Sequence, residues 1–138
     1  MRSQPIRIGS ETLDALRQRS AQTGEPVVCL AQRYIDEGIR LDRHPGITFR
    51  DGPAGRRPVV VGGPDVWEVI GAAHTASERG DELVDALAER IGTSPEQILI
   101  AVRYYAEFAD EIESWIALVE EEAERLEQTI ERERSLLD

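Results

Sequence analysis

The chain has 138 residues, of which 41% are hydrophobic, and a formal net charge of −11. The charge is divided: residues 1–57 carry ten arginines and seven acids, a net of +3, whereas residues 58–138 carry six arginines and twenty acids, a net of −14. The single cysteine, Cys29, excludes an internal disulfide and a cysteine-based zinc site, and its apolar neighbours predict a buried thiol. Because no apolar run approaches ~18 residues and no signal-peptide segment is present, we expect a cytoplasmic protein without a membrane contact.

The sequence offers no catalytic constellation. His44 and His74 lie thirty residues apart, without metal-ligand spacing, and Gly62-Gly63 lacks the Lys-Ser/Thr of a phosphate-binding loop. The many carboxylates fall on predicted helix surfaces. We therefore expect a protein that is not an enzyme and uses no cofactor or metal. The divided charge suits a nucleic acid at one end and a protein partner at the other.

The first 43 residues predict a short strand followed by two helices. Ile6 and Ile8 flank Arg7, an alternation typical of a strand with one apolar face. Ser10 is a good N-cap for the first helix, Thr23-Gly24 ends it, and Pro26 begins the second. One strand and two short helices cannot enclose a core, so we expect a second copy to complete it. The residues expected at this dimer interface are Ile6, Ile8, Leu30, Tyr34 and Ile39.

This order of elements resembles the ribbon-helix-helix DNA-binding fold. The matching residues are Pro5-Ile6-Arg7-Ile8, Gly9-Ser10-Glu11-Thr12-Leu13, Thr23-Gly24 and Tyr34-Ile35-Asp36-Glu37-Gly38-Ile39. The resemblance implies that Ser3, Pro5 and Arg7 face the major groove of operator DNA, and that the chain near Gly24 meets phosphate. A dimerisation module without DNA affinity is the alternative, because Glu25-Pro26 stands where a Ser or Thr would favour phosphate.

Residues 44–70 form a hinge dense in glycine, proline and arginine, and the run Val59-Val60-Val61 within it predicts one short strand. Arg50, Arg56 and Arg57 are candidates for phosphate contacts, with a solvated loop as the alternative. Helices are predicted over 65–73, over 81–91 and from Pro95 onward. The break Gly92-Thr93-Ser94-Pro95 predicts a tight turn between the last two, as in a helix-turn-helix.

Residues 44–108 resemble a small antitoxin-type domain encoded in bacteria beside toxins of the PIN-like nuclease group. The resemblance rests on His44-Pro45-Gly46-Ile47, Gly55-Arg56-Arg57-Pro58-Val59-Val60, Gly62-Gly63, Val66-Trp67-Glu68-Val69-Ile70, and Ser94-Pro95-Glu96-Gln97-Ile98 with Ala101, Tyr104 and Tyr105. It implies a VapB-like antitoxin of a type II toxin–antitoxin system, whose cognate toxin is a PIN-like ribonuclease.

Residues 109–138 contain no glycine or proline and predict one long helix of about seven to eight turns. Its apolar stripe consists of Ile112, Ile116, Val119, Ala123, Leu126, Ile130 and Leu137, with Trp115 beside it. We expect no other part of this small chain to cover the stripe, which leaves a second copy or a groove on another protein. The residues expected to bind toxin are Trp115, Val119, Leu126, Ile130, Arg132 and Arg134.

The expected fold is therefore mainly α and has three parts. A ribbon-helix-helix-like head (1–43) dimerises and binds DNA, a β-containing hinge precedes a small helix-turn-helix bundle (44–108), and an amphipathic helix (109–138) binds the toxin. We expect an antitoxin that neutralises its toxin through the C-terminal half and represses its own operon through the N-terminal half, as a homodimer or higher homo-oligomer. The alternatives are a stand-alone DNA-binding transcription regulator with a C-terminal coiled coil, and a dimeric adaptor that does not bind DNA.

Overall fold

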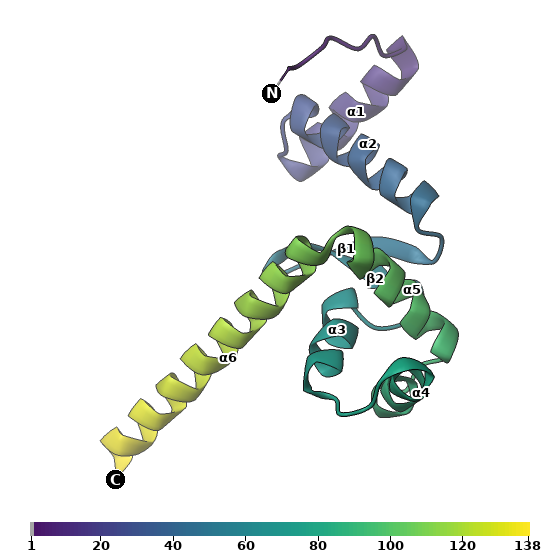
Figure 1. Ribbon diagram of the computed structural model, residues 1–138. Helices are drawn as coiled ribbons and strands as arrows, with labels where there is room; N and C mark the ends of the chain where they lie inside the picture. The colour runs from purple at the N-terminus through teal and green to yellow at the C-terminus, as the bar shows by residue number, and fades with distance from the viewer. Residues whose placement is uncertain (1) are drawn as a thin grey trace. The chain divides into compact units, whose positions relative to one another are not determined.

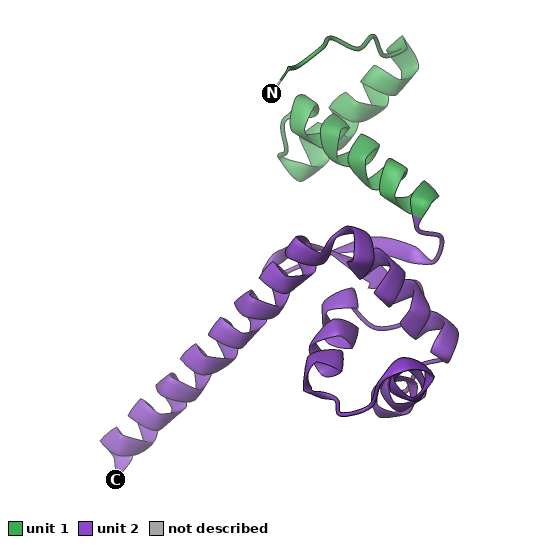
Figure 2. Ribbon diagram, viewed as in Figure 1, with its two compact units in different colours: residues 1–43 green, residues 44–138 purple. Residues whose placement is uncertain are grey.

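The computed structural model describes residues 2–138, and over these residues the fold is mainly α (Figure 1). Two helices, an antiparallel hairpin and four further helices follow one another in the order α1–α2–β1–β2–α3–α4–α5–α6. The chain divides into two compact units, residues 1–43 and residues 44–138 (Figure 2). No helix among the described residues is long and apolar enough to cross a membrane.

Unit 1 is a pair of contacting helices, α1 (Ser10–Thr23) and α2 (Val27–Arg43). Gly24 ends α1 with a φ of 78°, a left-handed conformation that favours glycine, and its N–H donates to the Ser20 carbonyl at 2.9 Å. The predicted break between the helices is confirmed. The predicted cap is wrong: Gly9 occupies the N-cap position without a side-chain bond, and Ser10 is the first helical residue.

Residues 2–9 precede α1 and form no strand in the single chain. All are exposed, including Ile6 at 74% and Ile8 at 37%. A strand is defined by its hydrogen-bonded neighbour, and these residues have no such neighbour within their own chain. The expected N-terminal strand is therefore absent from residues 2–9 of the described single chain.

Unit 2 begins with a hairpin in which β1 (Ile47–Gly52) pairs antiparallel with β2 (Gly55–Val60). Ile47 lies opposite Val60 at the open end of the hairpin, and Gly52 lies opposite Gly55 beside the turn. The strand predicted at 59–61 is thus longer toward its N-terminus and one residue shorter at its end. The sequence does not predict β1, because residues 48–51 contain one apolar residue, Phe49, and so show no clear alternation of apolar and polar side chains.

Four helices complete unit 2: α3 (Val66–Thr75), α4 (Gly80–Ile91), α5 (Pro95–Glu107) and α6 (Ala109–Leu137). The predicted turn between α4 and α5 is confirmed: Gly92 adopts a φ of 82° and Ser94 caps α5. The Ser94 hydroxyl accepts from the Gln97 backbone N–H at 3.2 Å, and the Gln97 side-chain oxygen Oε1 accepts from the Ser94 backbone N–H at 3.2 Å. This reciprocal capping box fixes the direction in which α5 begins.

The core of unit 2 gathers side chains from the hairpin and all four helices. Its fully buried members include Val66, Val69, Leu87, Ile98, Ala101, Tyr104 and Ile112. Ile112 and Ile116 belong to α6 and are 0% and 9% exposed. The expectation that nothing in the chain covers the α6 stripe is therefore wrong for its first two turns, which pack within unit 2. Beyond them, α6 extends away from α3, α4 and α5 (Figure 1).

Candidate functional site

Unit 1 exposes a row of aliphatic side chains on α2. Val28, Ile35 and Ile39 are 69%, 49% and 54% exposed. Their spacing of seven and four residues places them on one side of a helix, and we call this row the α2 face. Within described unit 1, Leu16 and Leu30 are the buried hydrophobic residues. So small a core rarely stabilises a unit of this size alone, so the α2 face is a candidate association surface.

The residues predicted for the dimer interface differ in how far they are exposed in the single chain. Ile6, Ile8, Tyr34 and Ile39 are exposed, whereas Leu30 is already 0% exposed in the single chain and supports the packing of α1 on α2. Val28 and Ile35 were missed, although their helical spacing with Ile39 is a visible signal. The prediction for Cys29 is wrong, because its thiol belongs to an exposed residue.

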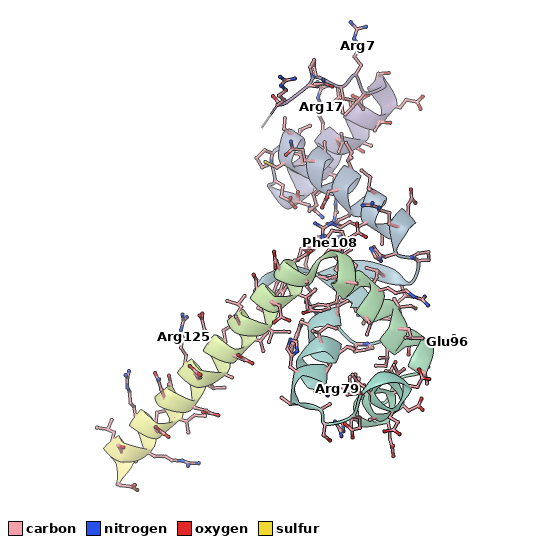
Figure 3. The ribbon with its side chains drawn as sticks, viewed as in Figure 1. Arg7, Arg17, Arg79, Glu96, Phe108 and Arg125 are labelled. Carbon is pink, nitrogen blue, oxygen red and sulfur yellow. The ribbon has the colours of Figure 1, made fainter. Side chains whose placement is uncertain are left out.

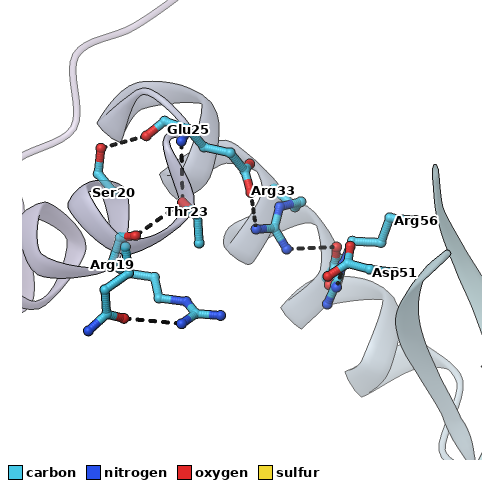
Figure 4. Close-up of polar contacts among 9 residues, drawn as sticks. Arg19, Ser20, Thr23, Glu25, Arg33, Asp51 and Arg56 are labelled. Carbon is cyan, nitrogen blue, oxygen red and sulfur yellow. Dashed lines mark hydrogen bonds and ion pairs between the residues drawn. The ribbon is translucent and has the colours of Figure 1, made fainter. Parts of the chain in front are cut away.

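Polar contacts fix the turn between α1 and α2 (Figure 4). The Ser20 hydroxyl donates to the Glu25 carbonyl at 2.5 Å, and the Glu25 N–H donates to Thr23 Oγ1 at 3.3 Å. The Glu25 carboxylate accepts from Arg33 Nη2 at 2.8 Å. The carboxylate that would repel phosphate near Gly24 is therefore paired with a guanidinium, which reduces that repulsion.

The residues predicted to contact DNA belong to separate units. Ser3, Pro5 and Arg7 lie in the exposed N-terminal segment, and the Arg7 side chain points away from the chain (Figure 3). Arg50 and Arg56 lie on the hairpin of unit 2, where Arg50 is exposed and Arg56 pairs with Asp51 at 3.3 Å.

Arg57 has a structural role in unit 2. Its Nε donates to Asp65 Oδ2, and its Nη1 donates to the Asp51 carbonyl at 3.2 Å. The indole N–H of Trp67 donates to the same Asp65 oxygen at 2.9 Å. Arg57 and Asp65 thereby join β2 to the start of α3 and orient the Trp67 ring.

That ring forms part of a groove of about 340 Å³, which we call the hairpin groove. The turn residues 52–55 line it together with Trp67 of α3 and with Trp115, Val119 and Glu122 of α6. A Cβ placed on Gly55 would lie 3.7 Å from Trp115 Cη2, so the indole lies against the hairpin backbone. Both tryptophans of the chain line this groove.

The hairpin groove carries more acid than base. Asp65, Glu68 and Glu122 line it, opposed by the single guanidinium of Arg57, which is already bonded to Asp65. Burial and the nearby charge of Asp65 raise the pKa of Glu68 above its ordinary value, opposed more weakly by a hydrogen bond with the Asp65 backbone and by the charge of Arg57. The groove therefore combines aromatic walls with negative charge.

Residues 120–137 form the exposed end of α6. Leu126, Ile130 and Leu137 are 62%, 40% and 85% exposed and continue the stripe that Ile112 begins inside the core. Arg125 projects from the side of this helix (Figure 3). Of the residues predicted to bind toxin, the structure brings Trp115 and Val119 into the hairpin groove and leaves Leu126, Ile130, Arg132 and Arg134 on the exposed end.

Two histidine contacts were missed by sequence reasoning. His44 Nε2 lies 2.6 Å from Glu107 Oε2, and His74 Nε2 lies 2.6 Å from Glu113 Oε1, an oxygen that also accepts from the Tyr105 hydroxyl at 2.8 Å. The bond from Tyr105, followed by the bond from His74, lowers the pKa of Glu113, and the same carboxylate raises the pKa of Tyr105. Within residues 2–138 no group of three or more His, Cys, Asp or Glu side chains could hold a metal ion. The contacts of Glu113 with His74 and Tyr105 instead join α3, α5 and α6.

The chain matches no protein-family model, no curated protein and no solved structure. Its function is therefore inferred from the α2 face, the hairpin groove and the exposed end of α6.

Proposed function

We propose that this protein is the antitoxin of a type II toxin–antitoxin pair. It holds a PIN-like ribonuclease through α6, dimerises through unit 1 and represses its own operon. The observation that carries the proposal is the exposed end of α6, where a well-formed helix presents apolar residues with no covering element among the described residues. Such a helix is a typical ligand for a groove on another protein.

The charge beside the stripe favours a basic partner. Residues 119–138 carry eight acids and three arginines, a net of −5. Glu122 and Glu127 border the stripe that contains Leu126 and Ile130, as helical spacing dictates. A ribonuclease must present basic residues to RNA, and such residues would face these carboxylates. Arg132 and Arg134 are the candidates for pairing with acids of the toxin.

Dimerisation is proposed for unit 1. Residues 5–8 of two copies would pair as antiparallel strands. This pairing would bury Ile6 and Ile8 on one side of the ribbon and supply the backbone hydrogen bonds between strands that the single chain lacks. The α2 face would be covered in the same assembly. The opposite side of the ribbon would then present Ser3, Pro5 and Arg7 to operator DNA.

A second candidate is a stand-alone transcription regulator whose α6 forms a parallel coiled coil. One observation favours it: Ile116, Val119, Ala123, Leu126 and Ile130 alternate in steps of three and four residues. The flanking charges oppose it. In that register Glu122 of each chain would face Glu127 of the other, which places like charges on both sides of the interface. A different, basic partner has no such repulsion.

The test is co-expression with the adjacent gene from the genome of origin, with an affinity tag on that gene's product. The proposal predicts that the untagged chain co-purifies with the tagged product and restores growth to cells that express the product. A chain that purifies without the product and leaves growth inhibited would refute the antitoxin function. Recovery as a lone oligomer bound to operator DNA would favour the stand-alone regulator.

A further inference from the structure

The hairpin groove is the most distinctive unassigned feature of unit 2. Trp67 and Trp115 line it from different helices, and the turn residues 52–55 line it as well, with Gly55 beside Trp115. The Asp65 carboxylate accepts from the Trp67 indole N–H, and the same oxygen accepts from Arg57 Nε. The Trp67 wall is thus held by a hydrogen bond before any ligand binds, which reduces the entropy lost on binding.

The chemistry of these walls selects a cation with an aliphatic stem. Tryptophan faces attract cations more strongly than other aromatic side chains, and guanidinium groups stack on them readily. The carboxylates of Glu68 and Glu122 add negative charge at the groove, while the Arg57 guanidinium is already committed to Asp65. Pro53, Ala54 and Val119 offer apolar surface for the methylene groups of an arginine.

The groove is also continuous with the α6 stripe. Val119 and Glu122 line the groove, and Leu126 and Ile130 follow one and two turns further along the same helix. A ligand anchored in the groove could therefore extend along the exposed end of α6. Its segment would need apolar residues for the stripe and basic residues for the neighbouring carboxylates.

We propose that the hairpin groove receives an arginine side chain from a basic, amphipathic segment of a protein partner, and that this arginine anchors the segment along α6. The inference rests on the proposed function in one respect, namely that the partner is the protein held by α6. It adds the chemistry of recognition: the partner supplies the cation, and this chain supplies two tryptophans and two carboxylates.

The experiment uses the full chain and a defined probe. The probe is a tryptophan-free helical peptide of about 15–20 residues, which is long enough for a stable helix. It carries leucine along one face and arginine on the other. A counterpart carries citrulline, the neutral isostere of arginine, in place of every arginine. Because both tryptophans of the protein line the groove, their emission reports occupation directly.

The arginine peptide is expected to change tryptophan emission saturably, and the citrulline peptide to bind at least about tenfold more weakly, because the cation is lost. Glu122→Gln should weaken binding about threefold to tenfold, and Trp115→Leu should weaken it further. The matched control is Glu124→Gln, which removes the same charge from another side of α6 and should change affinity by less than about twofold.

Equal binding of the two peptides, or unchanged emission with the arginine peptide, would overturn the proposal. Equal effects of Glu122→Gln and Glu124→Gln would also overturn it, because attraction would then follow net charge alone. The two proposals fail separately. Growth rescue that survives Glu122→Gln and Trp115→Leu would refute the groove and leave the antitoxin function standing. Specific binding of the arginine peptide, combined with failure to bind or neutralise the product of the adjacent gene, would refute the antitoxin function and leave the groove proposal standing.

Discussion

Replacing Ile112 with alanine tests whether the first turns of α6 belong to the core of unit 2. Ile112 is 0% exposed, so its truncation removes buried methyl and methylene groups and leaves a cavity. Such substitutions cost about 2–5 kcal/mol. A mid-range loss of about 3.5 kcal/mol, at a urea m-value of about 2 kcal/mol/M for a small protein, should lower the unfolding midpoint by roughly 2 M. The assay is urea unfolding followed by far-ultraviolet circular dichroism.

Ile130→Ala is the matched control, because it makes the same change on the same helix at a residue that is 40% exposed. It should lower the free energy of unfolding by less than about 0.5 kcal/mol, as is usual at exposed positions. Equal midpoint shifts for the two variants would refute the division of α6 into a packed beginning and an exposed end. So would an Ile112→Ala variant as stable as the parent chain.

The other predictions concern the cap, the acid side of the pH profile, the dimer and DNA. Ser94→Ala removes the hydroxyl that caps α5 and should cost about 1 kcal/mol in urea unfolding, whereas an unchanged midpoint would contradict the capping role. Because the folded-state pKa of Glu113 is lowered from 4.5, the stability it contributes is present above that pH and is lost as pH falls through the folded pKa. Glu113→Gln should therefore flatten the loss of melting temperature on acidification, and identical pH profiles would count against the contact. Ile35→Asp should shift the full chain from dimer to monomer in sedimentation equilibrium, and a persistent dimer would place the interface elsewhere. Arg7→Ala should weaken operator binding in mobility-shift titrations by about 1–3 kcal/mol if it makes a bidentate base contact; unchanged affinity would exclude the ribbon as the reader.

Local signals in the sequence identified the helical elements well. Gly92-Thr93-Ser94-Pro95 predicts the turn before α5 because each residue acts on its own backbone or on its near neighbours. The helix of α6 was predicted for the same reason, since its composition excludes both helix breakers.

Tertiary relations were harder to obtain. The strand β1 has no clear alternation of its own and is defined by pairing with β2, which a local pattern does not reveal. The stripe of α6 was visible, but periodicity does not distinguish a helix face covered by its own chain from one offered to a partner. Ile112 and Ile130 share that stripe, but Ile112 is buried in the core of unit 2 and Ile130 is exposed. The sequence makes Arg57 a phosphate candidate, because its bond to Asp65 joins residues from two elements and leaves no local signal in the sequence.

The most direct test of the account is growth rescue by the full chain carrying Leu126→Asp and Ile130→Asp, co-expressed with the adjacent gene. Both residues lie on the exposed end of α6, so the fold should persist while the apolar stripe is lost. Leu136→Asp is the control, because Leu136 is 87% exposed and lies off the stripe. The account predicts that the double variant accumulates as a folded protein but fails to restore growth, whereas Leu136→Asp restores it fully. Full rescue by the double variant would contradict the claim that α6 holds the toxin.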